Sequence, residues 1–349
     1  MRLVSFAFAK ATRLVFAAAA MAACSESHRS PTQLPERRPA TVRIAALTLD
    51  GGVAEGSVYV LQAAGPNGEP LRLDASGAAT IAASTGDTLS LTISPQATTR
   101  YYASHGTLVV SGDTTLEVVL IPTAWTVQRG RYVGARRAID IVKAFGSDAN
   151  DTHFLNYFSP TKGILVGWTE DDLPISVGYD TTGSTRRWTA ADSVWFWSTL
   201  IDVNDALGRT MFKPVTTVPL SAPRVIGVRV DYITPQTREG SLGIDLDACK
   251  PPVRVCTGGH GSIILGYPVF FRTAFEEENF RVMQHEMMHA LGFGHACYWP
   301  SVVMHTGVDC APTVPKDISV DDAAYIELVL RLATVLKAHP YAWHLEEAR

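Results

Sequence analysis

Between residues 41 and 122 the chain consists of short runs in which apolar and polar residues alternate. Clusters of Gly, Asn, Asp and Pro separate these runs, and alternation with a period of two is typical of half-buried β-strands. The runs are TVRIAALTL, SVYVLQA, GAATIAAS, DTLSLTIS, TLVVSG and TTLEVVLIP. The pattern therefore predicts a small all-β sandwich over residues 41–122.

The pattern changes after residue 122, so residues 123–349 are expected to form a second domain. The runs RRAIDIV, GILVGW, PISVGYD, RVIGVRVDYI and SIILGYPVFF are rich in β-branched residues and predict strands. Between them, residues 189–208 repeat apolar positions at helical spacing, and Gly208 can end a helix. Val194, Trp197 and Ile201 belong to that repeat, together with Asn204 and Leu207, and predict the face that packs on a sheet. A mixture of this kind predicts an α+β fold.

A second helix is expected before and within the histidine-rich segment HEMMHALGFGH. Thr273 and Glu276 form a capping-box signature, so the helix should begin near Ala274. Gly292 can adopt the positive φ that ends a helix.

The first 23 residues have the features of an export signal. Arg2, Lys10 and Arg13 precede the apolar run LVFAAAAMAA. This run is far shorter than the roughly 20 residues that cross a bilayer as a helix. We therefore expect residues 1–23 to be removed as a signal peptide.

The stretch MAAC resembles a bacterial lipobox, which implies cleavage before Cys24 and lipidation of that residue. Residues 24–40 are polar, contain proline and have no apolar periodicity, so they predict a flexible tether. These features imply attachment to a membrane of the bacterial cell envelope through the lipid. The alternative is a secreted protein whose Cys24 is lost or free.

Composition and charge exclude few classes of function. The chain has 349 residues, of which 46% are hydrophobic and 18% charged, and this is ordinary for a globular protein. Its formal net charge of -4 argues against a nucleic-acid partner. Nothing in the sequence indicates an oligomeric state.

Four cysteines follow the tether, at positions 249, 256, 297 and 310. An even number in an exported chain predicts two disulfides, for which three pairings exist. Proximity in sequence favours Cys249 with Cys256 and Cys297 with Cys310, because each pair closes a short loop. The weaker alternative is that a thiolate, that of Cys297 above all, binds metal.

The segment HEMMHALGFGH has the spacing of a zinc site. His285 and His289 are four residues apart, so both imidazoles lie on one face of the expected helix and can reach a single ion. The glycines that follow permit a turn that brings in His295 as a third ligand, and Glu286 lies beside the first ligand as a candidate general base. A chance match to H-E-x-x-H-x-x-G-x-x-H in a chain of this composition has a probability of about 10⁻⁴.

With Met304 in the downstream SVVM, this segment resembles the metzincin clan of zinc endopeptidases, over residues from about 160 to 335. The resemblance implies one catalytic zinc ion held by His285, His289 and His295, with Glu286 as general base and Met304 as the Met-turn residue. It further implies a twisted mixed sheet, an active-site helix, a C-terminal helix, and proteins or peptides as substrates.

The subfamily is undecided, because the positions that distinguish subfamilies depart from their patterns. Ala296 follows the third histidine where matrixins usually carry Ser or Thr and astacins Glu, and Thr306 stands where astacins and serralysins place a tyrosine. The run ISVDDAAYIELVLRLATVL resembles the closing helix of matrixins, with Ser319 and Asp322 as its cap. Residues 41–122 resemble a carboxypeptidase-regulatory-like module.

Two other functions are compatible with the motif. One is a surface binding protein that keeps a metalloprotease scaffold without turnover, although the presence of Glu286 speaks against it. The other is hydrolysis of a non-peptide amide or ester, which requires the same metal chemistry.

Overall fold

The computed structural model describes fourteen segments of the chain. They are residues 37–49, 56–62, 70–95, 100–139, 157–159, 164–180, 190–218, 224–231, 238–243, 255–256, 260–266, 277–296, 303–305 and 317–342. By its contacts the chain divides into Met1–Glu36 and a second compact unit, Arg37–Arg349. The predicted signal peptide, Cys24 and nearly all of the predicted tether lie outside the described residues.

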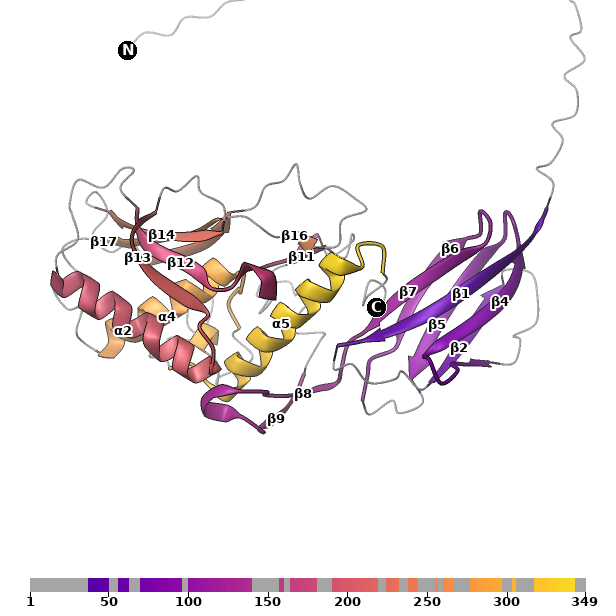
Figure 1. Cartoon of the computed structure of the whole chain (residues 1–349), viewed down its shortest axis with the longest axis horizontal. Helices are drawn as coiled ribbons and strands as arrows, with labels where there is room; N and C mark the ends of the chain where they lie inside the picture. Colours follow the sequence, from indigo (N-terminus) through magenta and orange to yellow (C-terminus); the bar gives the residue numbers. More distant parts are fainter. Residues whose placement is uncertain are drawn as a thin grey trace, which may run out of the picture. The chain divides into compact units, whose positions relative to one another are not determined.

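The first seven strands form two sheets (Figure 1). The strands are β1 (Pro39–Thr48), β2 (Gly56–Gln62), β3 (Leu71–Arg72), β4 (Ala78–Ser84), β5 (Thr88–Pro95), β6 (Ser104–Val109) and β7 (Thr114–Leu120). One sheet has the order β4-β1-β7 and the other β3-β2-β5-β6. In the first sheet β1 runs antiparallel to β4 and parallel to β7.

These strands form because one side chain in two is apolar and buried. Val42 and Ile44 of β1 and Leu89, Leu91 and Ile93 of β5 are at most 2% exposed. They belong to one hydrophobic cluster that also takes in residues of β4 and β7. The alternating runs of the sequence coincide with β1, β2, β4, β5 and β7. The run TLVVSG overlaps only the second half of β6, and the two-residue β3 is too short to show a period.

A short linking segment follows the seven strands. It contains β8 (Ala124–Thr126), the 3-10 helix η1 (Gly130–Tyr132) and β9 (Arg136–Ala138), and β8 pairs antiparallel with β9. The next small sheet has the order β10-β11-β16, from β10 (Tyr157–Ser159), β11 (Ile164–Val166) and β16 (Val255–Cys256).

A mixed five-stranded sheet is the centre of the remaining chain. Its order is β13-β12-β14-β17-β15, from β12 (Ile175–Asp180), β13 (Phe212–Val218), β14 (Val225–Asp231), β15 (Arg238–Gly243) and β17 (His260–Gly266). Four strands are parallel and the edge strand β15 is antiparallel to β17. Val177, Ile226, Val228, Ile263 and Leu265 are 0% exposed and lie on one face of the sheet. The alternate positions Arg229, Ser262 and Ile264 are partly exposed, so the described side chains are buried mainly on that one face.

Helix α2 (Ala190–Leu207) and helix α4 (Glu277–Leu291) contact each other and lie together along this sheet (Figure 1). The bounds of α2 agree with the sequence, and Gly208 has the positive φ of 60° that ends the helix.

Of the predicted buried face of α2, Leu207 is buried, but three other residues are exposed and were wrongly assigned. Val194, Trp197 and Ile201 are 58%, 40% and 58% exposed. The buried residues of α2 are Phe196, Leu200, Val203, Ala206 and Leu207, together with Thr199. Since α2 carries apolar residues on nearly every side, spacing alone selects no face, and contact with the sheet decides.

Helix α5 (Val320–Ala338) is buried over most of its length, including Leu328 and Leu332 at 0% exposure. Ser319 is its N-cap and forms the predicted capping box with Asp322. No described helix combines the length and the apolar content that crossing a membrane requires.

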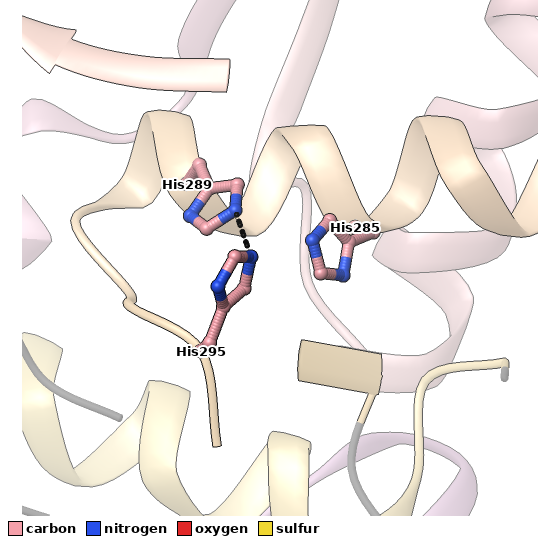
Figure 2. Close-up of side chains that lie close together, drawn as sticks. All are labelled: His285, His289 and His295. Carbon is pink, nitrogen blue, oxygen red and sulfur yellow. Dashed lines mark hydrogen bonds between the residues drawn. The ribbon is translucent and has the colours of Figure 1, made fainter. Parts of the chain in front are cut away.

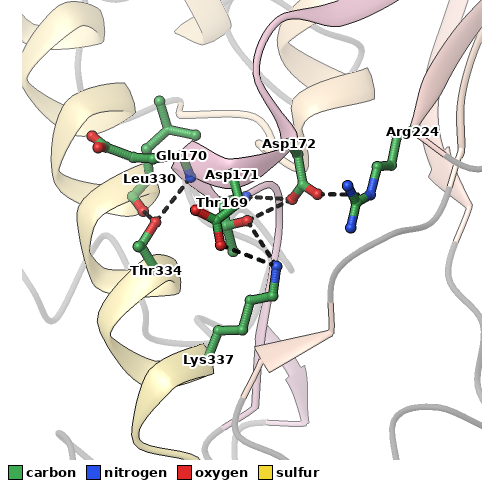
Figure 3. A network of polar contacts seen from close by, with 8 residues as sticks. All are labelled: Thr169, Glu170, Asp171, Asp172, Arg224, Leu330, Thr334 and Lys337. Carbon is green, nitrogen blue, oxygen red and sulfur yellow. Dashed lines mark hydrogen bonds and ion pairs between the residues drawn. The ribbon is translucent and has the colours of Figure 1, made fainter.

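The 3-10 helix η2 (Glu170–Asp172) is fastened to α5 by polar contacts (Figure 3). The Glu170 amide donates to Thr334 Oγ1 (2.9 Å), and Lys337 Nζ lies 3.4 Å from a carboxylate oxygen of Asp171. Asp172 accepts from the amide and hydroxyl of Thr169 and forms an ion pair with Arg224 at 3.2 Å. The start of the five-stranded sheet is thereby fixed to the C-terminal helix.

Candidate metal centre

Helix α4 positions the first two histidines. His285 and His289 project from the same side of α4, and their ring centroids are 4.8 Å apart (Figure 2). The helix ends at Leu291, and Gly292 has a φ of 100°, as the sequence predicts. Thr273, Ala274 and Glu276, on which the predicted start of the helix rests, lie outside the described residues; the described helix begins at Glu277.

The turn after α4 brings the third histidine to the first two. His295 Nε2 is 3.2 Å from His289 Nε2, and its ring centroid is 5.3 Å from that of His285 (Figure 2). One nitrogen from each of the three rings lies within 4.8 Å of the others. Among the described residues this is the group of histidine, cysteine and acidic side chains placed to hold a metal ion.

Backbone carbonyls orient two of the rings. His285 Nδ1 is 3.1 Å from the Val303 oxygen, and His289 Nδ1 is 2.7 Å from the Phe293 oxygen. A carbonyl oxygen can only accept, so in the neutral ring Nδ1 carries the proton and Nε2 keeps its lone pair. This is the orientation in which Nε2 serves as a metal ligand.

Burial keeps both rings neutral. It lowers the pKa of His285 to about 3, with a further lowering by the neighbouring His289, although the bond to Val303 opposes the shift. Burial likewise lowers the pKa of His289 to about 4. At neutral pH the two rings therefore offer lone pairs without prior loss of a proton.

The 3-10 helix η3 (Val303–His305) lies against these histidines and is held from two sides. Met304 is 0% exposed, and its carbonyl accepts from the Ala296 amide at 2.8 Å. The Val303 amide donates to the Asp322 carboxylate at 3.1 and 3.2 Å. The Met304 predicted at the Met-turn is thus packed beside the segment that carries His295.

Asp322 makes two kinds of contact, and the sequence predicts only the capping of α5. Besides capping α5 it binds Val303, whose carbonyl in turn orients His285. Burial raises the pKa of Asp322 to about 7, against hydrogen bonds from Ser319 and Val303 that favour the ionised form. A capping box is visible in a sequence, but a tertiary contact of the same carboxylate is not.

Glu286 is 5% exposed and lies on α4 beside His285. The edge strand β15 passes close to the backbone at this residue, because a Cβ added to Gly240 would overlap the Glu286 carbonyl. A glycine in a strand often marks such a close approach, but the sequence does not name the residue on the other side.

A buried polar connection between α2 and α4 was also not predicted. Gln284, 0% exposed, donates through Nε2 to Asp202 at 2.7 Å, and Arg131 pairs with the other oxygen of Asp202 at 2.8 Å. The indole of Trp168 donates to the Ala290 carbonyl at 3.0 Å. These contacts hold the part of α4 that carries His285 and His289 against its neighbours.

The predicted disulfides fall largely outside the described residues. Cys249, Cys297 and Cys310 lie outside the described residues, and of Cys256 only the backbone in β16 is described. Thr306 also lies outside them. Ala296 is buried at 1% exposure.

No model of a known protein family matches this chain, and a search of characterised proteins found no match. A streptococcal ancillary pilin resembles 27% of this chain over 37% of its own length, with 15% identity and a TM-score of 0.20. The Bacillus anthracis TIE protein resembles 25% of this chain over 17% of its own length, again with 15% identity and a TM-score of 0.20. The matches span less than half of either protein, and similarity at this level carries no weight for fold or function.

Proposed function

We propose that this chain is a zinc-dependent endopeptidase of the metzincin type. The observation that carries the proposal is the group formed by His285, His289 and His295, whose nitrogens lie within 4.8 Å of one another. Three histidine ligands with a position left for water are typical of catalytic zinc. The mixed sheet, α4 and α5 support the proposal, because the sequence resemblance implies a mixed sheet, an active-site helix and a C-terminal helix.

The residues present fit a zinc ion. Both Nδ1 atoms on α4 have backbone acceptors, which leaves Nε2 of His285 and His289 for metal, and their lowered pKa values keep the rings neutral. Bound zinc would lower the pKa of a coordinated water toward about 7 and polarise a carbonyl group.

Glu286 would act as the general base. As the carboxylate next in sequence to His285, it would take a proton from the attacking water and return it to the leaving nitrogen. Its burial at 5% exposure strengthens the interaction of its charge with a reacting centre.

The edge strand favours a peptide over a small substrate. β15 is the last strand of the described sheet and approaches α4 at Glu286. An extended peptide can add to such an edge through backbone hydrogen bonds, which would hold it across the histidine group. Export and attachment through Cys24 remain predictions from the sequence.

The test incubates the purified chain with an unstructured protein substrate, with and without a chelator. Beside it run Glu286→Gln and Asp205→Asn, the latter an exposed carboxylate on α2. We expect cleavage that chelation abolishes and zinc restores. Glu286→Gln should bind zinc at wild-type stoichiometry yet cleave at least about a hundredfold more slowly, whereas Asp205→Asn should match wild type.

Equal cleavage by Glu286→Gln and wild type, or full activity after complete metal removal, would contradict the proposal. If the chain binds zinc stoichiometrically but cleaves no peptide, the result would favour the alternative of a surface binding protein without turnover. Turnover of small esters or amides without peptide cleavage would indicate the third function.

A further inference from the structure

Two neighbouring cavities of about 260 Å³ each share the side chains of Trp125 and Gln128 as lining. Both lie apart from the three histidines, none of which lines either cavity. The first is lined by Arg129, Arg209 and Arg331 together with Glu170 and Glu327. The second is lined by Arg100 and Arg136 together with Tyr101, Pro122 and Thr126.

The lining of the second cavity has a net positive charge, because it includes Arg100 and Arg136 and no acidic residue. Both arginines are exposed. Within the described chain, no carboxylate forms an ion pair with Arg100, Arg136 or Arg129. Three guanidinium groups with unused donors therefore face the two cavities.

The carboxylates of the first cavity are engaged by its own wall. Glu170 pairs with Arg209 at 3.2 Å. Glu327 is 5% exposed, and its Oε2 accepts from the Trp125 indole at 3.2 Å and from the Gln128 backbone amide at 2.9 Å. Its Oε1 is buried without a hydrogen-bond partner among the described residues. Arg331 donates through Nε to the Leu49 carbonyl, which leaves its outer nitrogens without a carboxylate partner among the described residues.

The backbone that carries these arginines is fixed by hydrogen bonds. The Thr123 amide donates to the Arg100 carbonyl at 2.8 Å, and the Ile139 amide to the Thr123 carbonyl at 2.8 Å. Arg136 is the ladder partner of Thr126 in the β8–β9 pair. Glu170 is held in turn by Thr334 of α5 (Figure 3).

We propose that these two cavities together bind an oligoanion, a ligand carrying at least two phosphate or carboxylate groups, one for each cavity. Guanidinium groups bind both kinds of group through paired hydrogen bonds. Each cavity has room for one such group, and the shared wall of Trp125 and Gln128 sets the span between them. This site is independent of the metal centre.

The test measures binding by calorimetry at low and at physiological salt, after metal removal with phenanthroline, an uncharged chelator. The probes are inorganic pyrophosphate, citrate and orthophosphate. The variants are Arg136→Gln and Arg129→Gln, one from each cavity. Arg72→Gln, an exposed arginine on β3, is the matched control for charge. None of these side chains makes a hydrogen bond or ion pair within the described chain, so the fold should be kept.

We expect saturable one-to-one binding of pyrophosphate, citrate or both, and orthophosphate at least about tenfold weaker because it fills one cavity. Whichever oligoanion binds more tightly assigns phosphate or carboxylate as the ligand chemistry. Arg136→Gln and Arg129→Gln should each weaken binding about tenfold, and Arg72→Gln should not. The proposal is overturned if neither oligoanion saturates the wild type, or if Arg72→Gln weakens binding as much as the cavity variants.

Discussion

Gly240 is the residue at which strand β15 comes closest to the backbone of α4 at the candidate site. A side chain there would overlap the backbone of Glu286, so Gly240→Ala should push β15 away from α4. We expect a loss of about 1–3 kcal/mol in the free energy of unfolding, as for overpacking, together with slower cleavage. Denaturant unfolding measures the first effect and peptide turnover the second.

Gly112 supplies the control for this substitution, because a Cβ there meets nothing within 4 Å. Gly112→Ala should change stability by less than about 0.5 kcal/mol. Equal stability of Gly240→Ala and Gly112→Ala would mean that β15 does not approach Glu286 as described.

The raised pKa of Asp322 predicts that the free energy of unfolding depends on pH. Its pKa rises from an ordinary 3.8 in the unfolded chain to about 7 in the folded one, because of burial. Between about pH 4 and pH 7 the unfolded chain therefore loses this proton while the folded chain keeps it. The Asp322 contribution to the free energy of unfolding should fall as pH rises through that window and stay level above it.

Asp322→Asn isolates this contribution, because a carboxamide does not titrate. The measurement is urea unfolding of both proteins, free of metal, across that range. The stability of wild type relative to Asp322→Asn should decrease from pH 4 to pH 7. A difference that is constant, or that grows with pH, would show that Asp322 is ionised in the folded state throughout.

The sequence predicts the three histidines of the site, but it does not predict the groups that orient their rings. The spacing of His285, His289 and His295 specifies their convergence, since helix geometry and one glycine turn are local. The acceptors of their Nδ1 atoms, Val303 and Phe293, are backbone carbonyls that any residue supplies. Because every residue has a backbone carbonyl, the residue type does not show which carbonyls accept from the rings, and the structure is needed to identify them.

Helix α4 is held against α2 by the part-buried contact of Gln284 with Asp202. Asp202→Ala would leave the Gln284 amide buried without this acceptor and Arg131 without its carboxylate. We expect a cost of about 1–3 kcal/mol in the free energy of unfolding and weaker zinc binding, since α4 carries two ligands. Thermal unfolding and a zinc titration measure the two effects.

Asp205→Ala, on the same helix but exposed, is the comparison. It should lower stability by less than about 0.5 kcal/mol and leave zinc affinity unchanged. If the two alanine variants behave alike, the contact between Asp202 and Gln284 does not position α4.

The elements themselves were predictable where one period dominates. β1, β5 and β7 alternate clearly, and α5 has both a cap and an apolar run, so each was found from the sequence. β13 was not, because its run FKPVTTV contains a proline, which the structure tolerates at the outer edge of the sheet. β15, the run REGSLG, lacks the apolar side chains that mark a strand. The exposed face of α2 was misassigned because an all-round apolar helix is oriented by what it packs against.

The candidate metal centre joins several successive elements in the final third of the chain. Two ligands come from α4 and one from the turn after it. The ring of His285 is oriented by η3, and η3 is held by the first turn of α5. An ion at this centre would link the final third of the chain, so its binding should stabilise the folded state as a whole.

Zinc should therefore raise the unfolding temperature of the metal-free chain in calorimetry. A ligand at a hundred times its dissociation constant adds about 2.7 kcal/mol to the free energy of unfolding, which would shift the midpoint by several degrees. His295→Gln removes the ligand that closes the group and should abolish most of this shift. His105→Gln, on β6 and 2.9 Å from Thr92, should keep it. A zinc shift that survives in His295→Gln would place the ion elsewhere, because His295 closes the three-histidine group.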